Sequence, residues 1–295
     1  HIEKGPEINR KTNNYMLGRI KTYTKNLLKY MKSGGVVLIK FDKVSPGRRF
    51  EGRCVLVTGG SSGIGFETAR EYLAEGAEVI ITGRHDAALQ EAKEKLSSDR
   101  LHTMVWDVSD VKSIPQKLQE ATNLLAGKNI DIFINNAGVY VPENLDEYDE
   151  RTYDSIMATN TKGLFFTCQA EKKYFINNGI KGRIVNVCSA RGLIPGCDPY
   201  SISKWGAVCI TKGLAHDLAK HGIIVNGVAP GIVLTNISDW SKKLNINDNA
   251  FTAAHPTARY TLVEEIAGMI LYLSSDLGSN IVGEVVPVDG GWTLK

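Results

Sequence analysis

A glycine-rich segment, Thr58-Gly59-Gly60-Ser61-Ser62-Gly63-Ile64-Gly65, constrains the fold of this chain more than any other feature of the sequence. It follows an apolar run at 54–57 and precedes a stretch of helical pattern at 66–76. This context predicts a buried strand, a tight turn and the start of a helix. Glycines let a phosphate approach the backbone, and a helix N-terminus offers it free N–H groups and the positive end of a dipole. Taken alone, the segment would also suit a turn without a ligand.

Further motifs follow it in a fixed order: Asn135-Asn136-Ala137-Gly138, then Ser189, then Tyr200-x-x-x-Lys204. With the T-G-x-x-x-G-x-G spacing of the turn, this set resembles the classical short-chain dehydrogenase/reductase family over about residues 50–295. The joint occurrence is far more specific than any single motif. The resemblance implies an NAD(P)(H)-dependent oxidoreductase that interconverts a secondary alcohol and a ketone or other carbonyl compound.

Strand-like and helical segments alternate from residue 52 onward, and the strand-like runs are continuously apolar. Such runs suit a parallel sheet that is covered by helices on both faces. The sequence therefore predicts an α/β fold, a Rossmann-like, doubly wound, seven-stranded parallel sheet in three layers, α/β/α. The resemblance implies the strand order 3-2-1-4-5-6-7. The predicted strands are 54–58, 78–82, 102–107, 130–135, 182–188, 223–228 and 282–288.

Charge divides the chain into two parts. Residues 1–50 hold twelve Lys or Arg and three Asp or Glu, whereas residues 51–295 hold 23 and 29, so the body is mildly acidic and nucleic acid is not an expected partner. We interpret 1–50 as a basic N-terminal extension and 51–295 as a single catalytic, dinucleotide-binding domain. Residues 15–32 have the pattern of a basic amphipathic helix. We favour packing of this helix on the body or on a neighbouring subunit, with peripheral membrane contact as a less favoured alternative.

The five cysteines are scattered and lack the spacing of metal ligands, so no metal is expected. Four of them, Cys54, Cys168, Cys188 and Cys209, lie in apolar segments. We therefore expect reduced cysteines in the core and a cytoplasmic or similarly reducing location. No apolar run approaches the roughly 20 residues that span a bilayer.

The resemblance places a dinucleotide beyond the carboxyl ends of the strands. The glycine turn would hold the pyrophosphate, the end of the third strand the adenine, and the turn after the sixth strand the nicotinamide carboxamide. Tyr200 and Lys204 would also contact the cofactor. The other predicted cofactor-binding residues are Gly59, Ser61, Ser62, Gly63, Ile64, Gly65, Arg84, Asp107, Val108, Asn136, Ala137, Gly138, Pro230, Gly231, Ile232, Val233 and Thr235.

The end of the second strand bears on the choice of cofactor. Relatives that prefer NAD often carry an acidic residue where this chain has Gly83, and Arg84 follows it here. A carboxylate accepts hydrogen bonds from the ribose 2′-OH, whereas an arginine binds a 2′-phosphate. We therefore favour NADP(H) over NAD(H), although the glycine turn offers no second cation.

Tyr200 and Lys204 are four residues apart, so on a helix they share one face. A nearby ammonium and an oxidised nicotinamide would both favour the tyrosinate form, which lets Tyr200 act as general acid and base. Ser189 would hold the substrate oxygen. Asn160 matches the fourth catalytic position of the family and would hold a water in a proton relay. The alternative for Asn160 is a polar helix residue bonded to the backbone.

The loop before the tyrosine departs from the family pattern. Ser189 and Tyr200 are 11 residues apart, whereas many relatives have 13. The substrate therefore stays open: a 3-oxoacyl thioester, a sugar or polyol, and a hydroxysteroid all suit the motifs. A non-catalytic cofactor-binding protein is a remote alternative, because such proteins often lack the Tyr or Lys.

We expect a homo-oligomer, a dimer or tetramer, formed through helices near 149–175 and 199–221. We also expect a substrate lid at 235–260.

Overall fold

The protein contains a seven-stranded parallel sheet in the order β3-β2-β1-β4-β5-β6-β7, which confirms the order that the family resemblance implied. The computed structural model describes residues 24, 28, 31, 48–233 and 255–294. All neighbouring strands pair in parallel, so their carboxyl ends meet at one edge of the sheet. The strands are β1 (Cys54–Val57), β2 (Glu78–Gly83), β3 (Leu101–Val105), β4 (Ile132–Asn135), β5 (Arg183–Val187), β6 (Ile224–Pro230) and β7 (Val285–Val288).

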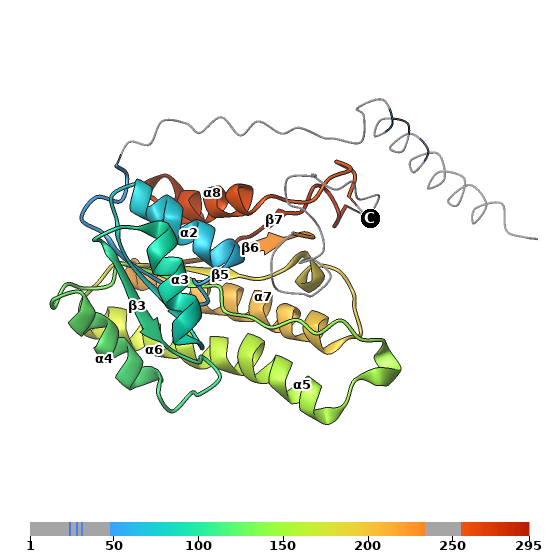
Figure 1. Cartoon of the computed structure of the whole chain (residues 1–295), viewed down its shortest axis with the longest axis horizontal. Helices are drawn as coiled ribbons and strands as arrows, with labels where there is room; N and C mark the ends of the chain where they lie inside the picture. The colour runs from blue at the N-terminus through green and yellow to red at the C-terminus, as the bar shows by residue number, and fades with distance from the viewer. Residues whose placement is uncertain (1–23, 25–27, 29–30, 32–47, 234–254, 295) are drawn as a thin grey trace, which may run out of the picture.

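Helices cover both faces of this sheet (Figure 1), because the strands are apolar on both sides. One face packs against α2 (Gly63–Ala74), α3 (Asp86–Leu96) and α8 (Val263–Ser274). The other packs against α4 (Ile114–Leu124), α6 (Leu164–Asn177) and α7 (Pro199–Leu218). A π-helical segment, Ala158–Gly163, joins α5 (Glu150–Met157) to α6. Short 3-10 helices lie at Leu145–Glu147, Ala190–Gly192, Ala219–His221 and Asp276–Gly278.

The residues just before β1 pack on the body. Phe50 is buried and meets the ring of Tyr72 edge-on, with centroids 4.8 Å apart. Arg49 donates to the Glu75 carboxylate at the end of α2. Most of the predicted amphipathic helix at 15–32 lies outside the described residues, so its packing stays a prediction.

The cysteines differ in part from the expectation. Cys54, Cys168 and Cys188 are buried and free, as expected for reduced core cysteines. Cys209 is exposed, so its assignment to the core was wrong. It lies on α7, a helix whose apolar pattern is not confined to the side that faces the sheet.

A buried polar network joins β4, β5 and the two helices that cover them. Asn135 donates to Glu171 Oε2 on α6 and to Asn186 Oδ1 on β5, each at 3.0 Å. Asn186 in turn donates to the Thr211 hydroxyl on α7 at 2.9 Å. Glu171 is fully buried, and this burial raises the pKa of its carboxyl to about 8. The carboxyl is therefore largely uncharged at neutral pH in the folded protein.

This raised pKa predicts a dependence of stability on pH. Because the folded pKa lies above the unfolded value of about 4.3, stability is fully present below that value and is lost as the pH rises to about 8. Glu171→Gln keeps an acceptor for Asn135 and cannot ionise. We expect its Tm, relative to that of the parent, to rise by about 5 °C or more between pH 5 and pH 8.5.

Thermal melts across this pH range would test the prediction, with Glu94→Gln as the control. Glu94 is an exposed glutamate on α3, and its replacement should leave the pH dependence unchanged. Parallel pH profiles for the parent and Glu171→Gln would show that Glu171 ionises normally.

Candidate functional site

A cavity of about 550 Å³ opens at the carboxyl edge of the sheet. It is lined from the glycine turn after β1, the ends of β2 and β3, and the turn after β4, which are the places that the sequence predicted. The predicted residues that line it are Gly59, Ser61, Ser62, Gly63, Ile64, Arg84, Asp107, Val108, Asn136, Ala137 and Gly138.

The turn after β1 requires its glycines. Gly59 and Gly63 have φ of 65° and 56°, a region that side chains disfavour. A Cβ atom at Gly59 would lie 2.9 Å from Ala137 Cα, and one at Gly65 would lie 2.4 Å from the Gly59 oxygen. Gly65 is therefore a packing residue beneath the cavity. The side chain of Ser62 makes no capping hydrogen bond to α2, so the helix start presents N–H groups that could hold a phosphate.

Hydrogen bonds between Thr58 and Asn136 fasten this turn to the end of β4. The Thr58 hydroxyl accepts from the backbone N–H groups of Asn136 and Ala137, at 3.0 and 3.1 Å. The Asn136 amide donates to the carbonyl oxygens of Thr58 and Gly59, at 3.0 and 2.9 Å. Asn136 therefore shapes the wall of the cavity by holding the backbone.

Arg84 lies at the rim of the cavity, exposed and beyond the end of β2. Next to it, a Cβ atom at Gly83 would lie 3.4 Å from Ser61 Oγ, so a larger side chain there would enter the same space. Asp107 lies just beyond β3 and accepts from the N–H and hydroxyl of Ser109, at 2.9 and 2.7 Å. It therefore also stabilises its own turn.

The predicted residues after β6 do not line this cavity. Gly231 packs against Asp289, where a Cβ atom would lie 2.7 Å from the Asp289 Cα. The N–H of Ile232 donates to His255 Nε2 at 3.3 Å, and Val233 forms a bridge with Thr261. Pro230 ends β6. Thr235 and most of the predicted lid lie outside the described residues.

Lys204 is buried on α7, one turn after Tyr200, as their spacing predicted. Its ammonium donates to the Val187 oxygen at 3.0 Å and lies 5.7 Å from the centre of the Tyr200 ring. Burial lowers the pKa of Lys204. A Cβ atom at Gly138 would lie 3.6 Å from this ammonium, so Lys204 borders the turn after β4.

Asn160 lies in the π-helical segment between α5 and α6 and is buried. Its amide oxygen accepts from the Val139 N–H at 2.8 Å, and its amide nitrogen donates to the Val139 oxygen and to Ser203 Oγ. Asn160 thus joins the turn after β4 to α7. These contacts match the alternative of a polar residue bonded to backbone.

Tyr200 lies beside Ser189, which is two residues beyond the end of β5. Burial raises the pKa of Tyr200, while a hydrogen bond with the Ser189 side chain and the charge of Arg191 lower it in part. Among the protein's own groups, the cost of burying a phenolate is the largest effect, and the depression expected from Lys204 together with an oxidised nicotinamide stays a prediction. Tyr200 therefore holds its proton at neutral pH.

Sequence reasoning missed several residues at this edge. Tyr140 lies edge-on to Tyr200 with ring centroids 4.8 Å apart, and His85 lines the cavity beside Arg84. Arg191 forms an ion pair with Asp198 at the start of α7. The position of Arg191 two residues after Ser189 was a usable signal. No local pattern marks Tyr140 or His85, because the fold alone brings them here.

The sequence profile described as short chain dehydrogenase matches residues 53–245. The chain belongs to the short-chain dehydrogenase/reductase family. It is accordingly an enzyme that acts on a CH–OH group with NAD(P)⁺ as acceptor. Membership in the family explains why a parallel sheet, a glycine turn and a tyrosine–lysine helix occur together.

Individual members of the family are similar over most of the chain. Gluconate 5-dehydrogenase from Gluconobacter oxydans is 36% identical, over 83% of this chain and 96% of the relative. The 3-oxoacyl-[acyl-carrier-protein] reductase of Chlamydia trachomatis is 35% identical, over 81% and 96%. A crystal structure of a short-chain type dehydrogenase/reductase from Mycobacterium marinum superposes with a TM-score of 0.76 at 30% identity, over 83% of this chain and 97% of that chain.

Within the described part of this chain, every helix is too short or too polar to cross a membrane.

Proposed function

We propose that this enzyme interconverts a secondary alcohol and a carbonyl compound by hydride transfer with NADP(H), and that Tyr200 transfers the proton. The observation that carries the proposal is the convergence of Tyr200, Lys204 and Ser189 on the carboxyl edge that also bears the glycine-lined cavity. The cavity fits a dinucleotide, because its turn leaves no room for side chains and ends at a free helix start.

The side chains divide the work of the reaction. When bound, the nicotinamide supplies or accepts the hydride. In reduction, the Tyr200 hydroxyl donates its proton to the carbonyl oxygen, and in oxidation the phenolate accepts the alcohol proton. Ser189 Oγ holds the substrate oxygen beside the phenol. The protonated state of Tyr200 near neutral pH favours proton donation to a carbonyl.

Lys204 and Asn160 act around this pair. The buried ammonium of Lys204 holds the ribose of the nicotinamide and favours the phenolate through its charge. Asn160 holds the turn after β4 against α7 and so fixes the distance between the cavity wall and Tyr200. The Asn160 amide oxygen accepts from the Val139 N–H, and its second lone pair could accept from a water of the proton relay.

The preference for NADP(H) rests on the end of β2. The exposed Arg84 guanidinium can pair with a 2′-phosphate, and no carboxylate occupies the position of Gly83. His85 lines the same rim and adds a hydrogen-bond donor for a phosphate oxygen. Together the two side chains offer the second contact that the glycine turn lacks.

Relatives suggest where to look for the substrate. Those described above are named for gluconate and for 3-oxoacyl-[acyl-carrier-protein], which differ in size and charge. The short loop between Ser189 and Tyr200 reshapes the substrate side of the site, so neither substrate transfers directly to this chain. Sugar acids, polyols, 3-oxoacyl thioesters and hydroxysteroids are the classes to test.

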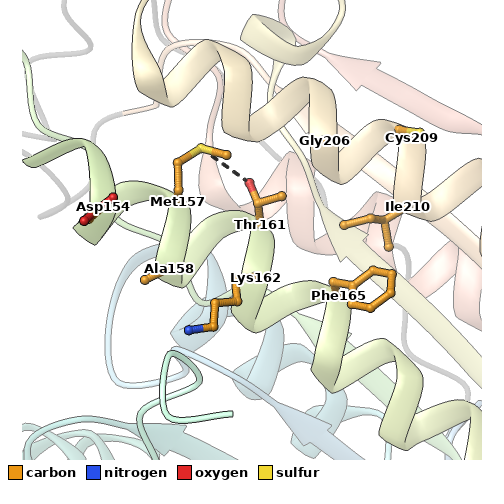
Figure 2. A pocket seen from close by; sticks show the side chains of 9 residues that line it. All are labelled: Asp154, Met157, Ala158, Thr161, Lys162, Phe165, Gly206, Cys209 and Ile210. Carbon is orange, nitrogen blue, oxygen red and sulfur yellow. Dashed lines mark hydrogen bonds between the residues drawn. The ribbon is translucent and has the colours of Figure 1, made fainter. Parts of the chain in front are cut away.

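An exposed apolar face supports self-association into a dimer or tetramer. Phe165 and Phe166 on α6 and Trp205 on α7 are 48%, 38% and 47% exposed. A groove of about 670 Å³ is lined by Met157 at the end of α5, Phe165 on α6 and Ile210 on α7, and Figure 2 shows Phe165 and Ile210 side by side. A second copy of the chain would remove these side chains from water.

A reducing compartment such as the cytoplasm fits the cysteines. All five are free, although Cys197 and Cys209 are exposed and thus open to oxidation. Exposed free thiols persist where the surroundings keep them reduced.

Tyr200→Phe tests the proposed reaction. The change removes the phenol hydroxyl and keeps the ring that packs on Tyr140. We expect turnover to fall by at least ~100-fold, the scale of general acid–base catalysis, with cofactor binding retained. Steady-state kinetics and a fluorescence titration with NADPH would measure the two effects. Turnover within a fewfold of the parent would remove Tyr200 from the mechanism.

Arg84→Ala tests the choice of cofactor. Only NADPH carries the 2′-phosphate, so we expect its affinity to fall roughly 10- to 150-fold, while NADH changes little, because a charge-assisted contact contributes about 1.5–3 kcal/mol. Arg151→Ala removes an exposed arginine on α5 and serves as the control. Equal and small effects on both cofactors would contradict the preference for NADP(H).

A further inference from the structure

The side chain of Arg191 ties the loop between Ser189 and α7 to the first turn of that helix, and Trp205 Nε1 donates to the Ile194 oxygen farther along the loop at 2.9 Å. Arg191 Nε donates to Ser201 Oγ at 2.9 Å, and its Nη2 forms an ion pair with Asp198. At its other end, the Arg191 N–H donates to Ser189 Oγ at 3.1 Å. One residue thus contacts the side chain of Ser189 and the residue that follows Tyr200.

Asp198 completes the connection from the helix. It is the N-cap of α7 and accepts from the Ser201 N–H at 2.9 Å and from the Ser201 hydroxyl at 2.7 Å. Because Tyr200 lies in this first turn, the same carboxylate fixes the start of its helix and the guanidinium of Arg191. The contacts replace what a longer loop could supply, since only ten residues separate Ser189 from Tyr200.

The position of Arg191 also matters for charge. Lys204 is buried, donates to the Val187 oxygen and lies 5.7 Å from the centre of the Tyr200 ring. Arg191 lies on the loop side and lowers the pKa of both Tyr200 and Tyr140, whereas Asp198 raises them. Two groups of opposite charge, paired with each other, therefore act on the phenol in opposite directions.

We propose that Arg191, held by Asp198, is a positioning residue for the reaction: it sets Ser189 against the helix turn that bears Tyr200 and keeps a positive charge on the loop side of the phenol. The charge of Lys204 acts on the Tyr200 phenol from α7, and a cofactor bound in the cavity would act on it from there. Arg191 supplies a third contribution from the shortened loop, so the substrate side of the site is itself part of the acid–base machinery. This inference rests on the proposed role of Tyr200.

The two roles separate in a set of variants. Arg191→Gln removes the charge, so the pKa of Tyr200 rises, and the alkaline rise of alcohol oxidation should move up by about one pH unit. Asp198→Asn keeps a helix cap and removes the negative charge, so the same limb should move down in pH. Arg191→Lys keeps the charge but loses the planar guanidinium that contacts both Ser201 and Asp198. The alkaline rise should therefore stay at the same pH while kcat falls about 10-fold. Arg48→Gln is the control: it breaks an exposed ion pair with Glu51 just before β1, so both the pH of the alkaline limb and kcat should stay unchanged.

The measurements are pH profiles of kcat and kcat/KM for each variant, together with the affinity for NADPH. Affinity for NADPH should stay within about twofold of the parent value, because none of the three residues changed in these variants lines the cavity. Shifts of Arg191→Gln and Asp198→Asn in the same direction, or no shift in either, would overturn the proposal.

A second readout does not depend on turnover. The phenolate absorbance of the parent minus that of Tyr200→Phe isolates the titration of Tyr200, and the same difference can be taken in the Arg191→Gln background. We expect a higher pKa for Tyr200 in that background. An unchanged titration would refute the inference on its own. A parent without any alcohol–carbonyl activity would refute the proposed function instead, whatever the titration shows.

Discussion

The site depends on the hydrogen bonds between Thr58 and Asn136, which join the ends of β1 and β4. A parallel sheet brings strand ends to one edge but does not set how closely their turns approach. Here a hydroxyl and an amide each bond the backbone of the opposite turn, and Gly59 has no Cβ to hold the turns apart. The cavity for a dinucleotide follows from this contact.

A second set of polar contacts places the reacting side chains against that cavity. Asn160 joins the turn after β4 to α7, and Lys204 bonds the last residue of β5. Arg191 then joins Ser189 to the first turn of α7. Each contact satisfies a buried or half-buried polar group, so the same bonds that stabilise the fold also orient the chemistry.

The apolar strand patterns predicted the layers, and the glycines predicted the close turn after the first strand. The sheet order and most of the cavity lining came from the resemblance to the family. It did not predict that Cys209 would be exposed, since an apolar helix pattern does not say which face a neighbour covers. It also did not predict how much burial raises the pKa of Tyr200, because a spacing of four shows that Lys204 is near but not how far the phenol is desolvated. The ion pair between Arg191 and Asp198 depends on the conformation of the loop between β5 and α7, and the spacing of apolar residues does not predict a loop conformation.

The most direct test of the account is hydride transfer by the unmodified chain. The absorbance of reduced nicotinamide would be followed with NADPH and NADH against ketones from the sugar acid, polyol, 3-oxoacyl thioester and steroid classes, and the product alcohol identified. The account predicts that at least one ketone is reduced at the expense of the cofactor, faster with NADPH. Tight binding of NADPH without its oxidation by any ketone, and without reduction of NADP⁺ by any matching alcohol, would contradict it.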